Sequence, residues 1–481
     1  MRSAPRAASA AVLLAVFSGC TLAPRYQRPA APVPATAGAA PADAAPDAAE
    51  LGWREVFGDE RLRALVALAL ENNRDLRVAA LNVELTRAQY RIQRAAELPA
   101  VSASASGTRQ HVPADLSPAG RAVTTTSWSV GGVLTAFELD LFGRVRSLAA
   151  AALEQFLQTE EARRSAHLSL VGAVATQYLV ARALDDQIAL ARGTLEGLEA
   201  SYALVRRTYE AGRTSELDVR TAEAQVHAAR FNLASAELAR TQAENALALL
   251  VGAPLPADLP APLPLEAQRI VADLPAGVAS EVLQRRPDVL AAEHALRSAN
   301  ASIGAARAAF FPSITLTAFG GTSSTELSRL FSPGTDAWSF SPRINLPIFQ
   351  GGALRASLDV AHLRKSIEIA RYERTVQAAF REVSDALAAR AALETQLRAQ
   401  EARVNAEQRR YELSDLRYRK GVDSYLVVLT AQRDLFAARQ LLIQSRLARL
   451  ASLVDVYRAL GGGWREHGVQ AGAPARPPGG S

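Results

Sequence analysis

Histidine is the residue type in this chain that could most readily bind a metal or transfer protons. The six histidines stand far apart in the sequence, and no two have the spacing of a metal site. They are His111, His167, His227, His294, His362 and His467. No catalytic set of side chains and no phosphate-binding loop accompanies them. We therefore expect a protein that is not an enzyme and that has no metal and no bound cofactor.

The single cysteine, Cys20, stands where a lipid could be attached covalently. Two arginines precede an apolar run at residues 10–17, and small residues lead directly into Cys20, which is the pattern of a signal peptide over residues 1–19. A cysteine at this point resembles the lipobox of a lipoprotein, although Phe17 stands where leucine is usual, so we expect an N-acyl diacylglycerol on Cys20. An ordinary signal peptide with an incidental cysteine is the alternative. Thr21 takes the place of the aspartate that retains some bacterial lipoproteins at the inner membrane, which favours the outer membrane.

Charge and hydropathy exclude several classes of protein. The net charge of +6 arises from 54 basic and 48 acidic residues that are dispersed along the chain, so we expect no nucleic-acid partner. One cysteine cannot form a disulfide framework. After the signal peptide, no segment offers the roughly 18 uninterrupted apolar residues that a transmembrane helix needs.

The chain is a tandem duplication. Two stretches of more than a hundred residues, 119–253 and 348–473, contain none of the 24 prolines. Near their ends lie matching segments at 209–219 and 418–428, and the offset of 209 residues continues without a gap beyond them. Shorter segments upstream repeat at an offset of 213 residues. Because proline is excluded from helix interiors, the duplicated stretches predict very long helices.

The repeat predicts one extended architecture with two equivalent halves. At its ends we expect the signal peptide, a lipidated extended segment at 20–52 and a disordered tail at 462–481. The first repeat, 53–252, is expected to hold short helices, strands at about 100–112 and 123–140, a long helix at 144–211 and a return helix at 215–252. After a proline-rich linker at 253–277, the second repeat, 278–461, is expected to hold a helix at 287–310, strands at about 312–324 and 336–347, a long helix at 353–420 and a return helix at 424–461.

The expected strands have the alternation of a membrane β-barrel. Apolar and small residues alternate with serine and threonine in both repeats, a pattern that also fits an ordinary hairpin on a soluble domain. Four strands cannot close a barrel within one chain, because eight is the usual minimum. If they cross a membrane, several copies of the chain must share one barrel.

The two long helices have seams of different polarity. The first carries a coiled-coil pattern of Leu184, Ile188, Ala191, Leu195, Leu198, Tyr202, Val205 and Tyr209. At the equivalent positions of the second, Gln400, Glu407 and Ser414 replace apolar residues. This predicts a polar-lined neighbour or lumen beside the second seam. Drift of these positions into solvent is the alternative.

The chain resembles the outer-membrane efflux lipoproteins of the TolC-like outer membrane factor superfamily, in the NodT-type branch that serves RND efflux systems. The resemblance covers nearly the whole chain. It is carried by segments at 19–29, 286–293, 303–314, 418–421 and 459–464.

This resemblance implies a fold class that is mainly α with a membrane β-barrel part. Four β-strands per protomer would complete a 12-stranded barrel in a homotrimer. The long coiled-coil helices would form a periplasmic α-barrel. The implied partners are a periplasmic membrane-fusion adaptor, an inner-membrane RND-type pump reached through that adaptor, and the lipids of the outer membrane.

The turns between long and return helices are the expected functional surface. Glycines permit a tight reversal there, and in the resembling family such tips meet the adaptor. The expected contact residues are Gly212, Arg213, Thr214, Ser215, Gly421, Val422 and Ser424. The alternative is that these segments are only capped turns without a partner.

The resemblance also places a periplasmic gate at Asp423 and Tyr418. Three symmetry-related carboxylates from Asp423 would select cations. Asp423 could instead be only a helix N-cap, and Tyr418 could serve only in packing. Other family members carry acids at the positions of Val427 and Thr430, so we expect this gate to differ from theirs.

The sequence therefore predicts an outer-membrane exit channel of a tripartite efflux pump, which passively conducts small molecules such as drugs and toxic compounds. A type I protein-secretion duct and a lipid-anchored structural coiled coil in the periplasm are the alternatives. The lipobox favours efflux over secretion, and a structural coiled coil would conduct nothing.

Overall fold

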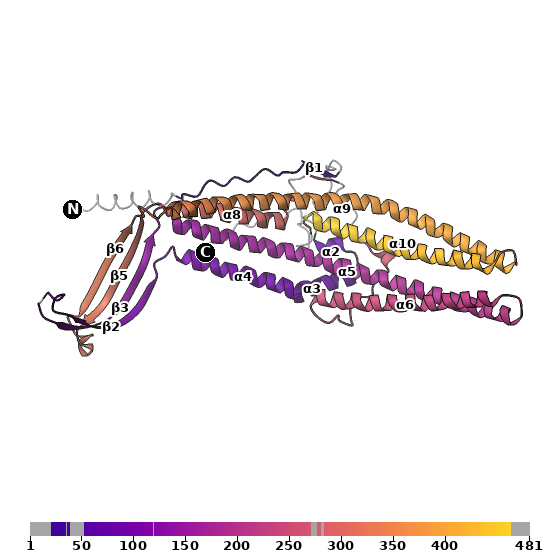
Figure 1. Cartoon of the computed structure of the whole chain (residues 1–481), viewed down its shortest axis with the longest axis horizontal. Helices are drawn as coiled ribbons and strands as arrows, with labels where there is room; N and C mark the ends of the chain where they lie inside the picture. Colours follow the sequence, from indigo (N-terminus) through magenta and orange to yellow (C-terminus); the bar gives the residue numbers. More distant parts are fainter. Residues whose placement is uncertain are drawn as a thin grey trace. The chain divides into compact units, whose positions relative to one another are not determined.

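A computed structural model describes residues 21–34, 36–38, 52–118, 120–270, 277–279 and 283–462 of the chain (Figure 1). The expected signal peptide, Cys20 and all of the expected tail beyond Gly462 lie outside these residues. The chain divides into two compact units, each of which contains parts of both repeats. The first unit comprises residues 1–30, 82–160 and 291–373; the second comprises 31–81, 161–290 and 374–481.

The first unit holds a four-stranded antiparallel sheet in the order β2-β3-β5-β6. The strands are β2 Val101–Val112, β3 Val123–Leu139, β5 Ser313–Ser324 and β6 Asp336–Asn345. The two repeats meet at the β3–β5 pairing, where Gly131 faces Gly321. A Cβ atom on Gly321 would lie 2.1 Å from the carbonyl oxygen of Val130, so this close approach requires glycine. Within this sheet, β2 and β6 each have one edge without a paired strand.

Four helices run through the first unit, wholly or in part (Figure 1). They are α4 Arg74–Ala95, α5 Arg144–Glu210, α8 Pro287–Ala308 and α9 Ala353–Arg419. α5 and α9 have 67 residues each, so each is on the order of 100 Å long at 1.5 Å per residue. Of the helices in the described part of the chain, none combines the length and apolarity needed to cross a bilayer.

A buried carboxylate fastens the N-terminal segment to α8. Glu293 is almost fully buried and accepts hydrogen bonds from Arg28 (2.7 Å), Arg297 (2.7 Å) and the hydroxyl of Tyr26 (3.1 Å). Burial alone would raise the pKa of Glu293, but the two guanidinium groups outweigh it and lower this pKa. The segment from Leu22 to Arg28 is therefore attached by charge-assisted hydrogen bonds rather than by a hydrophobic core.

The second unit contains the largest hydrophobic core, which surrounds Trp53, Phe57, Tyr178 and Tyr457. Its further elements are β1 Thr36–Gly38, α2 Trp53–Val56, α3 Glu60–Asn72, α6 Glu216–Val251, the 3-10 turn η2 Leu265–Ala267, β4 Gly277–Ala279 and α10 Tyr425–Ala459. Asp59 caps α3 by accepting from the backbone of Arg61 at 2.8 Å. The sequence does not predict the antiparallel pairing of β1 with β4, which joins the expected extended segment to the start of the second repeat.

The expectation of a lumen or of solvent beside the second seam is wrong at two of its three polar positions. Gln400 is only 8% exposed and donates from Nε2 to the carbonyl oxygen of Ala438 at 2.7 Å. Ser414 is 7% exposed. Both side chains are therefore buried within the described chain, and the amide of Gln400 has a backbone acceptor on α10.

Candidate functional site

The candidate site consists of the two turns that join the long helices to their return helices, both in the second unit. We call residues 208–218, between α5 and α6, the first tip. Residues 417–427, between α9 and α10, are the second tip. The 209-residue offset superimposes one on the other in sequence.

The backbone of the two tips is closely similar. Gly212 and Gly421 have φ angles of +69° and +72°, the left-handed region that glycine adopts without strain. Their N–H groups donate at 2.8 Å to Tyr209 and Tyr418, respectively. A Cβ atom at either glycine would meet nothing within 4 Å. Glycine is therefore required by the backbone angle and not by crowding.

The first tip is closed by hydrogen bonds around one carboxylate. Ser215 is the N-cap of α6, and its hydroxyl accepts from the N–H of Asp218 at 3.2 Å. Asp218 in return accepts from the hydroxyls of Thr214 at 2.6 Å and Ser215 at 2.8 Å, which lowers its pKa. Arg213 and Leu217 remain exposed beside this capping box.

The second tip is closed by an ion pair. Arg417 donates from Nε and Nη2 to the two carboxylate oxygens of Asp423, at 2.6 and 3.0 Å. This two-point contact with a guanidinium lowers the pKa of Asp423. The N-cap position of α10 belongs to Ser424, so the alternative interpretation of Asp423 as the N-cap is wrong. The side chain of Ser424 makes no capping hydrogen bond.

We call α5 with α6 the first hairpin and α9 with α10 the second hairpin. Tyr425, at the start of α10, connects the two. Its ring is buried, and its hydroxyl lies 2.6 Å from the hydroxyl of Ser201 on α5. Burial raises the pKa of Tyr425, so the hydroxyl stays protonated at neutral pH. The ring of Tyr418 packs against Tyr425 with 5.3 Å between centroids and an angle of 50°. Tyr418 thus lies at the margin of the small core that joins the hairpins.

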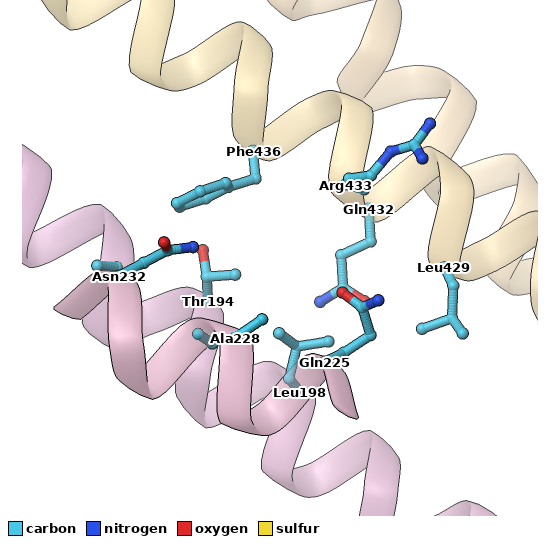
Figure 2. Close-up of a pocket in the computed structure, with 11 residues that line it drawn as sticks. Thr194, Leu198, Gln225, Ala228, Asn232, Leu429, Gln432, Arg433 and Phe436 are labelled. Carbon is cyan, nitrogen blue, oxygen red and sulfur yellow. The ribbon is translucent and has the colours of Figure 1, made fainter. Parts of the chain in front are cut away.

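A pocket opens between the first hairpin and α10, one to three helical turns from the second tip (Figure 2). Amide side chains from both hairpins, Gln225 and Gln432, are turned toward the same space (Figure 2). Leu198, Leu429 and Phe436 supply apolar lining. The pocket can accept an apolar side chain from a partner and offers amides to bind its backbone or polar groups.

No group of three or more metal-ligating side chains occurs among the residues that the structure describes. Five of the six histidines lie on separate strands or helices, and His467 lies outside the described part. His294 faces Glu154 with 2.6 Å between Nδ1 and Oε2. The expectation that the protein is not an enzyme stays a prediction.

Known proteins resemble this chain over nearly its whole length. The model of the family described as outer membrane efflux protein matches residues 65–253 and 278–462, once in each repeat. The chain belongs to the outer membrane efflux protein family. This membership confirms the family expected from the sequence and the outer-membrane location. The duplicated, mainly helical fold with a four-stranded sheet is confirmed as well.

Two relatives and one solved structure show the extent of this similarity. The toluene efflux pump outer membrane protein TtgC of Pseudomonas putida is 50% identical over 474 residues, which are 97% of each chain. The outer membrane protein OprJ of Pseudomonas aeruginosa is 45% identical over 97% of this chain and 98% of its own. The open-state structure of the MtrE outer membrane channel of Neisseria gonorrhoeae matches with a TM-score of 0.85 and 43% identity, covering 93% of this chain and 99% of that one.

The structure brings the expected tip residues together but adds three that the sequence analysis missed. Asp218 could have been found, because Ser215 and an acid three residues later form a recognisable capping box. Arg417 and Tyr425 could not. Their roles depend on which side chains meet across a chain reversal and between two hairpins, and no spacing rule describes either contact.

Proposed function

We propose that this efflux protein is the outer-membrane exit channel of a tripartite pump and conducts small molecules passively. One observation carries the proposal: over 97% of its length the chain is 50% identical to outer membrane proteins named for antibiotic and toluene efflux. The substrates proposed for this chain are accordingly small toxic compounds and drugs. Their selection would fall to the pump, because the proposed channel only conducts passively.

The proposed assembly is a homotrimer. Each copy contributes its four strands to one 12-stranded barrel in the outer membrane, and the long helices form the wall of a periplasmic duct. The open edges of β2 and β6 support this, because an unpaired strand edge is a template for pairing with another chain. Large apolar side chains on β6, Trp338 and Ile344, are exposed in the single chain, as expected for a lipid-facing strand.

The proposed partners meet the protein at the tips. Two hairpin ends that expose Arg213, Leu217, Val422 and Leu426 suit a periplasmic adaptor, through which an RND-type inner-membrane pump would deliver substrate. The pocket behind the second tip gives a helical hairpin of the adaptor a place to insert a side chain. Asp423 and Tyr418 remain the proposed gate, with Arg417 now included because it holds the carboxylate.

We also propose that Cys20 carries the lipid anchor. The N-terminal segment supports this, since residues just after Cys20 are held on the first unit by defined bonds. Asn300 donates to the carbonyl oxygen of Pro24 at 2.8 Å, and Arg28 binds Glu293. Mass spectrometry of the mature N-terminus is expected to find an acylated cysteine. An unmodified N-terminus would contradict the lipid anchor but would leave the proposed channel function unaffected.

The function is tested by complementation. A strain that lacks its outer-membrane efflux component, but retains adaptor and pump, receives this protein or the Cys20→Ala variant. Restored resistance to toluene or antibiotics, together with lower accumulation of a fluorescent pump substrate, would support the proposal. If this protein is folded and located in the outer membrane, yet exports an unfolded polypeptide and no small molecule, the proposal of an efflux channel is wrong and the protein is a secretion duct.

Partner identity is tested with a photo-crosslinker at Ser215 or Ser424 in living cells, with Thr241 on α6 as the matched control away from the tips. Capture of a periplasmic adaptor from the tip positions alone, with its pump co-purifying, would support the proposed docking. Capture of peptidoglycan-bound proteins only, from a protein that forms no pore in bilayers, would favour the structural coiled coil.

A further inference from the structure

The two faces of the four-stranded sheet carry side chains of different chemistry. On one face β6 exposes large apolar side chains, which are Trp338, Phe340 and Ile344. The opposite face is rich in serine, and the hydroxyl oxygens of Ser106 on β2 and Ser129 on β3 lie 2.8 Å apart there. We call the face that carries Trp338 the apolar face.

The pairing register extends the apolar face from β6 to β2. Gly320 of β5 pairs with Trp338 on one side and with Gly132 of β3 on the other. Gly132 pairs in turn with Ala103 of β2. Because successive residues of a strand point to opposite faces, every second residue of β2 after Ala103 lies on the apolar face. These residues are Ala105, Gly107, Arg109 and His111.

Trp128 of β3 marks the boundary of the apolar face on the side away from the helices. It pairs with Gly107, and a Cβ atom on that glycine would lie 2.4 Å from the indole ring. Tryptophan collects at the level of lipid headgroups in membrane proteins. The face between Ile314 and Ser324, the partner of Trp128, rises about 25 Å for a strand tilt of about 40°, which matches the apolar band of an outer-membrane barrel.

Beyond Trp128 the apolar face ends in a group of hydrogen-bonding side chains. Arg109 pairs with Thr126 and His111 pairs with Thr124, and Nδ1 of His111 lies 3.1 Å from Oγ1 of Thr124. We call these four residues the outer cluster. They lie next to the loop that joins β2 to β3, at the end of the sheet away from α4 and α5 (Figure 1).

The guanidinium of Arg109 is exposed and has no ion-pair partner among the residues that the structure describes. At the helix end of the sheet, by contrast, Arg144 and Arg146 are paired with Glu138 and Asp140, respectively. The acid Asp336 shares the apolar face with Arg109, but it lies on β6 at the opposite edge of the sheet. A cation on a lipid-facing strand is costly at the centre of a bilayer and tolerated near its surface, where phosphate groups can neutralise it.

We propose that the outer cluster binds the phosphate of a lipid headgroup in the outer leaflet of the membrane. The guanidinium of Arg109 donates two hydrogen bonds to the phosphate, a geometry for which arginine is suited. The imidazole of His111 and the hydroxyl of Thr126 add further hydrogen bonds, and the ring of Trp128 lies beside the first part of the acyl chains. The inference rests on the proposed exit channel, because it requires the sheet to cross the outer membrane with the helices on the periplasmic side.

The test is native mass spectrometry of the full-length protein in detergent, with three probes added in turn. They are bisphosphorylated lipid A, the same lipid without its phosphates, and inorganic phosphate. We expect the phosphorylated lipid to bind at least about tenfold more tightly than the dephosphorylated one, because hydrogen bonds between charged groups are lost with the phosphates. Inorganic phosphate at the same concentration should not displace the lipid.

Variants assign this binding to the outer cluster. Arg109→Gln/His111→Gln should weaken binding of the phosphorylated lipid about tenfold or more and leave binding of the dephosphorylated lipid unchanged. The matched control is Arg343→Gln, since Arg343 lies on the serine-rich face of β6 near the helix end and should not affect either lipid. Equal binding of the phosphorylated lipid by the double variant and the unchanged protein would overturn the site. Displacement of the lipid by inorganic phosphate would also overturn it, because a free anion would then be the ligand.

A further variant tests whether Arg109 has a protein partner instead. If Arg109 pairs with the partner subunit's Asp336, Asp336→Asn and Arg109→Gln should destabilise the oligomer equally, and neither should change lipid binding. That result would overturn the lipid site. We expect Asp336→Asn to leave binding of the phosphorylated lipid within about twofold of the unchanged protein, because surface charges at a distance are screened by salt.

The lipid site and the proposed function fail in different experiments. If the protein restores efflux and the double variant binds the phosphorylated lipid as tightly as the unchanged protein, the lipid site is wrong and the function stands. If the protein neither reaches the outer membrane nor restores efflux, the proposed function is wrong, and the lipid site is wrong with it.

Discussion

The two tips share a backbone but differ in what closes them. In both, a glycine with φ near +70° reverses the chain and donates to a tyrosine carbonyl. At the first tip, Asp218 gathers hydrogen bonds from residues of the same turn and helix start. At the second, Arg417 reaches across the turn to Asp423, and Tyr425 packs between the hairpins.

This difference shows which part of a duplicated turn is constrained. The glycine is needed wherever the helix reverses, since other residues would be strained at that angle. The side chains that follow are free to change as long as the start of the return helix is stabilised in some way. The first tip is stabilised locally. The second depends in addition on the contact of Tyr425 with α5, which makes it the more suitable of the two for a gate that must open.

Removal of Tyr425 should have the largest effect and should sharpen this contrast. Tyr425→Ala deletes a buried ring and is expected to destabilise the second tip by about 3 kcal/mol. Its counterpart in the first repeat is the exposed Glu216, and Glu216→Ala should change stability by no more than about 0.5 kcal/mol. Hydrogen exchange of the first turns of α10 and α6 measures both. Equal protection losses in the two variants would contradict the dependence of the second tip on tertiary contacts.

The serines at the two N-cap positions should respond differently when they are replaced. Ser215→Ala removes a capping hydrogen bond and should cost about 1 kcal/mol at the start of α6. That cost corresponds to roughly fivefold faster exchange of the amides in its first turn. Ser424→Ala removes no such bond, so exchange at the start of α10 should stay close to that of the unchanged protein. A larger effect at Ser424 than at Ser215 would reverse the comparison.

Loss of the second-tip carboxylate should affect conduction more than stability. Asp423→Ala is expected to give a leakier, less cation-selective pore, because three carboxylates per trimer are lost. The change should be about twofold or less at 0.15 M salt, where charges are screened beyond about 8 Å. Asp218→Ala is the control, since that carboxylate serves the cap of α6. Single-channel recordings in planar bilayers measure the conductance and ion selectivity of both variants. Unchanged values in Asp423→Ala would show that Asp423 is not part of the gate.

The pH dependence of the second tip should be the smallest effect. The pKa of Asp423 is lowered below its ordinary value of 3.8, and that of Arg417 is raised, each by the other. A lowered carboxyl pKa means that the ion pair is complete at neutral pH and is lost only as pH falls through that lowered value. Conductance and selectivity should therefore stay constant between pH 8 and 5. A transition within that range would show that another group controls the gate.

Much of the architecture follows from the sequence, whereas the polar contacts do not. The proline-free stretches mark α5 and α9, and period-two alternation marks the strands, because helix and strand geometry act on every successive residue. Gln400 shows the limit. A glutamine in a coiled-coil seam suggests water or a polar neighbour, but here a single backbone carbonyl on α10 satisfies it. Such a partner is chosen by packing between helices and leaves no periodic signal.

The sequence alone determined the duplication, the long helices, the glycine-centred reversals and the family, because each depends on local geometry or on patterns repeated along the chain. Only the tertiary structure decided that Asp423 is held by Arg417 and that Tyr425 contacts Ser201 on α5. The first contact crosses a chain reversal, and the second joins residues that lie far apart in the chain. They depend on how helices pack side by side, which no single segment specifies.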